Sequence, residues 1–198
     1  DHIMGQAAQT AAEVKVEIIG GHTEITPAVK QPVIVSTAIG KALKGVSQSG
    51  NDMVPGDFIM MTKAVGLEGS GIIASDYEEQ LSSVLSAKEL ARAKSFLELV
   101  SVVPEGIAAG SIGTHGMHDI TEGGILGAVW EMCQISGRGA QVWEHEIPIE
   151  PETVKICDHY EIDPLRLISS GSMVIIVPKE KKEQMEKAMA EAGVACSV

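Results

Sequence analysis

The chain has 198 residues, of which 44% are hydrophobic, and a formal net charge of −12. This length and composition allow a real hydrophobic core, in one domain or in one domain and a fragment of another. The negative charge and the aromatic content of 3% argue against a nucleic acid or an anionic membrane surface as the main partner. The three cysteines lack CxxC spacing, which disfavours a disulfide framework or structural zinc and fits a reducing cytoplasm. No apolar run reaches the roughly 18 residues of a membrane span.

The first 45 residues contain one predicted helix and two predicted strands. Residues 1–13 place apolar side chains on one helical stripe, and Val14–Ile19 alternates between apolar and polar residues before a Gly-Gly pair. A second strand, Val33–Ile39, is rich in β-branched residues. The turn-rich segment Gly45–Gly56 follows, and we place a domain boundary there.

The second part of the chain alternates between strand and helix patterns. Phe58–Thr62 is a predicted strand, Ala87–Val100 an amphipathic helix, and Gly106–Gly116 a glycine-rich loop. The other predicted elements are a turn entering a helix at Ala64–Ser75, a helix at Thr121–Ser136, a strand at Ala140–Glu146, short helices at Pro151–Tyr160 and Pro164–Ile168, a strand at Ser172–Val177 and a helix at Lys179–Ala192. This alternation predicts a layered α/β or α+β domain.

The most informative stretch runs from Gly116 to Gly127, where a short polar loop leads into a predicted helix. Asp119 or Thr121 can cap that helix, while its free amides and its dipole offer a site for an anion. His118 can donate a hydrogen bond to the anion, and Asp119 can bind an accompanying cation. A purely structural loop, with capping residues and closely packed glycines, fits the same pattern, and the spacing alone does not separate the two interpretations.

Two further loops place polar residues after a strand. Gly20–Pro27 gathers an imidazole, hydroxyls and a carboxylate, a set suited to Mg²⁺ and phosphate oxygens, although an ordinary turn is the simpler explanation. Thr62–Gly71 is a strand end, a polar turn and a helix start. It is not a P-loop, because its lysine precedes the glycines.

Taken together, the loops resemble a known family. In order, they read Gly-Gly-His-Thr-Glu, Thr-Lys-x-x-Gly-Leu-Glu-Gly and Met-His-Asp-Ile-Thr-Glu-Gly-Gly, followed by Ile-Asp-Pro-Leu and Ser-Ser-Gly-Ser. This series is similar to the aminoimidazole ribonucleotide (AIR) synthase-related proteins, close to the hydrogenase-maturation carbamoyl dehydratase. The resemblance covers nearly the whole chain. It implies an α+β carboxy-terminal domain at 55–198, a layered fold with a mixed sheet packed by helices, preceded at 1–45 by a remnant of the amino-terminal domain.

The resemblance also implies an ATP and Mg²⁺ site. The residues it places on the metal and nucleotide side are Gly20, Gly21, His22, Thr23 and Glu24. Those on the phosphate or substrate side are His118, Asp119, Thr121, Gly123 and Gly124, and those lining the cleft between are Thr62, Lys63 and Glu68. Within these sets, His118 and Asp119 are the predicted catalytic residues, and Glu24 and Asp119 the predicted metal ligands.

The implied reaction is phosphoryl transfer from Mg-ATP to a small molecule or a carbamoyl-type acceptor, carried out by a cytoplasmic homodimer. Such catalysis rests on positioning and charge stabilisation. Because the family's metal-binding aspartates lie in the domain before these residues, we expect this chain alone to be inactive. Two alternatives remain open, a non-catalytic domain that binds a nucleotide or anion and regulates a partner, and an interaction domain whose loops are structural only.

Overall fold

The computed structural model describes residues 2–41 and 50–198, and the chain divides into two compact units, Asp1–Ala42 and Leu43–Val198. In the first unit, helix α1 (His2–Glu13) is followed by extended chain without regular secondary structure as far as residue 41. The segment predicted as a connector, Gly45–Gly56, lies partly outside the described residues. Its described end contains the short 3₁₀ helix η1 (Gly50–Asp52).

The two strands predicted in the first unit are not formed. Val14–Ile19 and Val33–Ile39 have strand-like sequences, but neither forms a strand ladder with any described residue. A strand needs a neighbouring edge for its N–H and C=O groups, and sequence preference alone does not supply one. Their apolar side chains are left in solvent, with Val35 88% exposed.

We expect the exposed Val33–Ile39 segment to drive self-association, because unpaired strand-like chain is a template for β pairing. Val35→Lys should lower the apparent mass in light scattering at high protein concentration. Ile107→Lys, which changes an exposed residue on a helix, is the matched control and should leave the mass unchanged. A strictly monomeric parent chain at high concentration would contradict the prediction.

The second unit is built on one four-stranded sheet. Its strands are β1 (Phe58–Thr62), β2 (Gly116–Asp119), β3 (Met173–Val177) and β4 (Cys196–Ser197), in the order β2-β3-β1-β4. All three ladders are antiparallel, and the parallel pairing among the described residues is the isolated bridge between Val65 and Ile149. The predicted α+β class is confirmed, with a sheet whose ladders run antiparallel.

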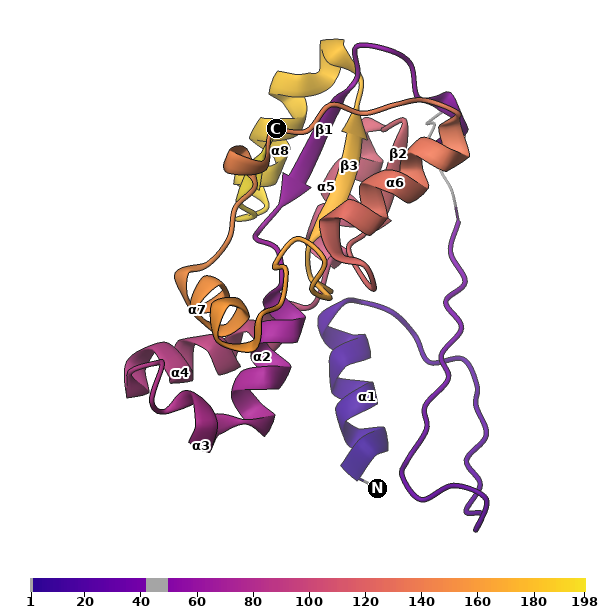
Figure 1. Ribbon diagram of the computed structural model, residues 1–198. Coiled ribbons are helices and arrows are strands. Elements are labelled where there is room, and N and C mark those ends of the chain that lie inside the picture. The colour runs from indigo at the N-terminus through magenta and orange to yellow at the C-terminus, as the bar shows by residue number, and fades with distance from the viewer. Residues whose placement is uncertain (1, 42–49) are drawn as a thin grey trace. The chain divides into compact units, whose positions relative to one another are not determined.

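Helices cover both faces of this sheet (Figure 1). Every residue of β3 is buried, and alternate side chains enter different cores. Met173, Ile175 and Val177 pack with α5 (Val103–Ile112) and α8 (Lys182–Glu191). Val174 and Ile176 pack on the other side with α6 (Gly124–Ser136). The central strand is therefore apolar throughout because neither of its faces meets water.

A third core lies among helices at one end of the sheet. These helices are α2 (Leu67–Asp76), α3 (Glu78–Leu81), α4 (Ala87–Ser95) and α7 (Pro151–Tyr160), and the 3₁₀ helix η2 (Phe96–Leu99) follows α4. Leu67, Leu81 and Ile156 are fully buried there. Arg92 on α4 forms ion pairs with Glu150 and Glu152 at the start of α7.

Glycine accounts for two differences from the predicted elements. The predicted loop Gly106–Gly116 contains most of α5, which begins with a proline in its first turn and tolerates its glycines within the helix. The predicted helix Thr121–Ser136 begins only at Gly124, because Gly123 adopts a left-handed φ of 85° and is the N-cap. Residues Gly116–Asp119, predicted as a loop, instead form β2.

The remaining differences concern short segments. Pro164–Ile168 is a turn and not a helix. The predicted strand Ala140–Glu146 is not formed, and the only regular structure there is the 3₁₀ helix η3 (Glu144–Glu146). The predicted helix Lys179–Ala192 consists of the 3₁₀ helix η4 (Lys179–Lys181) and α8.

Within the described residues, no single helix combines the length and hydropathy of a membrane span. One pair, Ala87–Leu99 with Val103–Ile112, reaches both criteria together but is bent by 48°.

The first turn of α4 makes the free energy of unfolding depend on pH at acidic values. Ser86 and Glu89 form a capping box, and the hydrogen bonds from Lys155 and Ser86 lower the pKa of Glu89 from 4.5 to about 2. A carboxyl group whose pKa is lowered by folding stabilises the folded state at pH values above its ordinary pKa of 4.5. That stability is lost as the pH falls towards 2. The free energy of unfolding, measured with urea, should therefore fall less steeply between these pH values in Glu89→Gln than in the parent chain. Glu79→Gln removes an exposed carboxylate that is not part of a capping box, so its free energy of unfolding should fall with pH as steeply as that of the parent chain. An equally steep fall in all three proteins would contradict the role given to Glu89.

Candidate functional site

The antiparallel sheet brings three of the predicted motif segments to one end. β1 and β2 finish where β3 begins, and Asp119 pairs with Met173. The Met173 amide donates to the Thr62 hydroxyl at 3.0 Å, and the Ile120 amide donates to the Ser172 carbonyl at 2.9 Å. Residues after β1, after β2 and before β3 therefore form one surface, which we call the sheet-end loops (residues 62–68, 119–124 and 163–172).

The third of these segments joins the starts of two helices. The Leu165 carbonyl accepts a hydrogen bond from the Leu126 amide in the first turn of α6. The Ile168 carbonyl accepts one from the Gly69 amide in the first turn of α2. Some of the amides that a bound anion could use are thus bonded to protein carbonyls. The predicted cap by Asp119 or Thr121 is wrong, since the N-cap of α6 is Gly123 and no side chain caps it.

Close packing explains why residue 124 is glycine. Its φ is +61°, and a Cβ there would lie 2.3 Å from the Leu165 carbonyl oxygen. Gly123 is different, because a Cβ there would lie 3.4 Å from Gly127 Cα, an ordinary contact. Gly124 therefore holds α6 against the 163–172 segment, whereas Gly123 is exposed at the start of the helix.

Gly124→Ala should destabilise the domain more than Gly137→Ala. Both glycines have a left-handed φ near +60°, but a Cβ at 137 would meet no atom within 4 Å. The backbone conformation costs each variant on the order of 1 kcal/mol, and only Gly124→Ala must also displace the Leu165 carbonyl. Urea unfolding that gives equal losses for the two variants would refute this explanation of Gly124.

Lys63, predicted to line a nucleotide cleft, is bonded to the protein itself. Its φ is +53°, and its Nζ lies 2.5 Å from a Glu105 carboxylate oxygen. The same Nζ donates to the carbonyls of Gly171, Ser101 and Leu99 at 2.6, 2.8 and 3.2 Å. An ammonium group has three N–H donors, so these four acceptors occupy all of them.

Glu105 depends on this lysine. It lies at the start of α5, is fully buried, and its second carboxylate oxygen has no hydrogen-bond partner among the described residues. A buried carboxylate is costly unless it is paired, and Lys63 is the cation that pairs with it. The ion pair therefore ties the end of β1 to α5 and, through Gly171, to the turn before β3.

Lys63→Met should cost about 3–5 kcal/mol of stability, because it leaves Glu105 buried without a cation. Adding Glu105→Gln should recover part of the lost stability, because it removes the unpaired charge. The recovery is incomplete, since the three carbonyls that Lys63 bonded still have no donor. Lys181→Met is the matched control. Lys181 donates to two carbonyls, of Ile112 and Gly113, and forms no ion pair among the described residues, so its loss should be only about 1–2 kcal/mol. If the two lysine variants unfold at the same denaturant concentration, the role given to the ion pair is wrong.

His118 and Asp119 lie at the end of β2. The His118 Nδ1 is 2.5 Å from the Asp119 carbonyl oxygen, and its Nε2 is 2.7 Å from a carboxylate oxygen of Glu131 on α6. Burial of the ring favours its neutral form, but these hydrogen bonds and the charges of both acids raise the pKa of His118 above its usual value. The Asp119 carboxylate points to solvent, 57% exposed, with its nearest cation, His118, 3.8 Å away.

The other predicted residues of this unit differ in accessibility. Thr62 is fully buried, and its hydroxyl bonds to the Met173 amide. Glu68 is half-buried, with one carboxylate oxygen that has no partner among the described residues. Thr121 is half-buried, and its carbonyl accepts a bond from Gly124. Sequence reasoning missed Glu105 and Glu131, because their partners lie 42 and 13 residues away in the chain.

The loop predicted to bind metal and nucleotide belongs to the first unit and is described by itself. Gly20, Gly21, His22, Thr23 and Glu24 are all exposed. His22 Nε2 lies 3.7 Å from a Glu24 carboxylate oxygen, and both side chains are largely in solvent.

Comparison with known proteins identifies the fold. The family model for the carboxy-terminal domain of AIR synthase related proteins matches residues 54–198. The chain belongs to this family. A putative hydrogenase expression/formation protein of Methanocaldococcus jannaschii is 30% identical over 188 residues, covering 93% of this chain and 52% of the relative. The carbamoyl dehydratase HypE of Rhodobacter capsulatus is 25% identical over 201 residues, covering 99% and 57%. The chain thus spans about half the length of these relatives.

Solved structures share the fold of the AIR synthase-related domain. The crystal structure of Escherichia coli HypE, a hydrogenase maturation protein, gives a TM-score of 0.60 at 22% identity, covering 74% of this chain and 43% of that one. Thiamine-monophosphate kinase from Stenotrophomonas maltophilia gives 0.61 at 13% identity, covering 77% and 49%. At these identities the likeness establishes the fold alone.

A resident metal site does not fit the described part of this AIR synthase-related domain. No group of three or more His, Cys, Asp or Glu side chains among the described residues could hold a metal ion. The exposed carboxylates of the sheet-end loops, those of Asp119, Glu122 and Asp163, therefore do not form an all-protein Mg²⁺ site. No step below is therefore derived through a metal.

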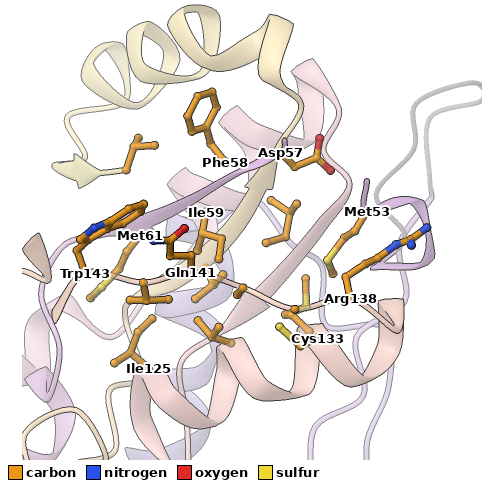
Figure 2. Close-up of a pocket in the computed structure, with 18 of the residues that line it drawn as sticks. Met53, Asp57, Phe58, Ile59, Met61, Ile125, Cys133, Arg138, Gln141 and Trp143 are labelled. Atoms are coloured by element: carbon orange, nitrogen blue, oxygen red, sulfur yellow. The ribbon is translucent and has the colours of Figure 1, made fainter. Parts of the chain in front are cut away.

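An apolar cavity of about 630 Å³ lies on the α6 side of the sheet (Figure 2). Ile59 and Met61 of β1 form its floor, Ile125 and Cys133 of α6 one wall, and Trp143 lies at its margin. The segment predicted as a strand at Ala140–Glu146 also lines the cavity, and it has no regular secondary structure before η3. The sequence patterns gave no signal for the cavity.

Proposed function

We propose that this chain is part of an ATP-dependent enzyme that transfers a phosphoryl group to a carbonyl-type oxygen of a small molecule or of a carbamoyl-type group. The observation that carries the proposal is the assembly of three of the family's motif segments at one end of the sheet. Relatives are named carbamoyl dehydratase, and one HypE structure was solved in complex with ATP and another with HypF. We propose a nucleotide and such an acceptor as the ligands of the full-length protein.

The geometry supports distinct roles for the residues of the sheet-end loops. Asp119 is an exposed carboxylate at the end of β2 and is our proposed catalytic group. The donors of His118 and Lys63 are bonded within the protein, so these residues would act through charge and by holding the loops in place. Phosphoryl transfer suits such an arrangement, because it is catalysed mainly by positioning and electrostatic stabilisation.

The rest of the site would come from outside residues 54–198. We propose that residues 1–45 are the remnant of an amino-terminal domain, and that its Gly20–Glu24 loop contacts the nucleotide, with Glu24 near its Mg²⁺. The exposed strand-like segments of this part support a homodimer, since they require a partner for pairing.

A non-catalytic domain that binds an anion and regulates a partner is the second candidate. The commitment of Lys63 and His118 to internal hydrogen bonds favours it, because no free cationic donor of these two residues meets a ligand. Product analysis separates the two candidates, since only the enzyme forms ADP and a phosphorylated or dehydrated acceptor.

Asp119→Ala should abolish ATP turnover in the full-length protein, because it removes the proposed catalytic group. The present chain alone should show no turnover above background. In the family the preceding domain supplies several charge-assisted contacts to the triphosphate, each worth on the order of 1.5–3 kcal/mol, and without them the chain has no organised transition-state site. The assay is ADP release, with the exposed Asp76→Ala as a control that keeps parent activity. Turnover by the present chain at the rate of the full-length protein would overturn the proposal, because it would show that the sheet-end loops suffice for catalysis.

A further inference from the structure

The peptide unit that follows Asp119 is held at both of its polar groups. The Ile120 N–H donates to the Ser172 carbonyl at 2.9 Å, and the Asp119 C=O is 2.5 Å from His118 Nδ1. A peptide unit is planar, so hydrogen bonds at its opposite sides fix its rotation. Ile120 is itself fully buried. The direction in which the chain leaves Asp119 is therefore set by β3 on one side and by the His118 ring on the other.

The His118 ring is held in turn by Glu131. A backbone carbonyl and an ionised carboxylate can only accept hydrogen bonds, so both ring nitrogens donate, one to Asp119 and the other to Glu131. Glu131 lies seven residues after Gly124 on α6, two turns into the helix. Among the described residues it is the side chain that fixes the ring from outside β2.

We propose that Glu131 is a positioning residue for the sheet-end loops, which holds the Asp119 carboxylate in place through His118. This inference rests on the proposed function, in which Asp119 is the catalytic group of the sheet-end loops. It assigns to the His118–Glu131 pair a task beyond stability, for which a half-exposed ion pair is worth only about 0–1 kcal/mol. The chain of contacts runs from the Glu131 carboxylate through both ring nitrogens to the main chain of Asp119.

The first measurement needs no ligand. In Glu131→Ala, the Ile120 amide should lose protection in hydrogen exchange, and the ring ¹⁵N signals of His118 should move from the pattern of two protonated nitrogens. Glu131→Gln keeps an acceptor for Nε2 and should preserve most of the Ile120 protection. Gln134→Ala, an exposed site one turn further along α6, and Glu180→Gln, an exposed carboxylate elsewhere, should match the parent chain.

The second measurement uses inorganic phosphate as the probe and follows the Gly123 and Gly124 amides by NMR. Glu131→Ala should weaken phosphate binding about three- to tenfold, because the loop is then less ordered in the free protein and must be ordered when phosphate binds. Glu131→Gln should recover most of the affinity, and both control variants should stay within about twofold of the parent.

The two measurements distinguish failure of the inference from failure of the proposed function. Unchanged Ile120 protection in Glu131→Ala overturns the positioning role, whatever binds. If the parent chain shows no phosphate-dependent shift at Gly123 and Gly124, the anion site fails and the functional part of the inference fails with it. Lost protection with unchanged phosphate affinity would leave Glu131 a structural residue only, which also overturns the proposal.

Discussion

The buried ion pair between Lys63 and Glu105 is the constraint on which the sheet-end loops depend. The lysine takes a left-handed conformation that a residue with a side chain adopts only at some cost, and all its donors are bonded to oxygens from three other segments. Those segments are the start of α5, the chain before it and the turn before β3. One cation therefore fixes the relative positions of segments that are far apart in sequence.

The remaining contacts of the site build on this junction. Once the turn before β3 is fixed, the Ser172 carbonyl can hold the Ile120 amide, and the chain after β2 takes its direction from that bond. Gly124 then allows α6 to approach the Leu165 carbonyl, and Glu131 on the same helix reaches back to His118. Asp119 is left as an exposed carboxylate on a backbone held from two sides. Such a carboxylate suits a reaction that depends on positioning more than on proton transfer.

Local patterns predicted the elements that local forces determine. Phe58–Thr62, whose sequence favours a strand, forms β1 with the predicted bounds. Pro151–Tyr160, which has a proline at its start, forms α7, also with the predicted bounds. Prediction failed where the outcome depends on distant partners. Val33–Ile39 has the composition of a strand but no described edge to pair with, and Gly116–Asp119 becomes a strand only because β3 lies beside it.

The candidate site shows the same division. The motif residues could be found from sequence because glycines and polar residues cluster there. The meeting of the three motif segments of the second unit at one end of the sheet follows from the antiparallel order. The role of Lys63 could not be found, because its partner Glu105 carries no motif and lies 42 residues away, beyond α2, α3 and α4. The use of both His118 nitrogens likewise depends on a glutamate whose position on α6 is set only when the helix packs on the sheet.

Native-state hydrogen exchange of three amides tests most directly whether one junction holds the sheet-end loops. These amides are Met173, bonded to Thr62, Ile120, bonded to Ser172, and Gly69, bonded to Ile168. In Lys63→Met, the account predicts that all three lose protection together, by at least about tenfold relative to the Val154 amide within α7. Protection that falls at only one of the three, or that falls equally at Val154, would contradict it.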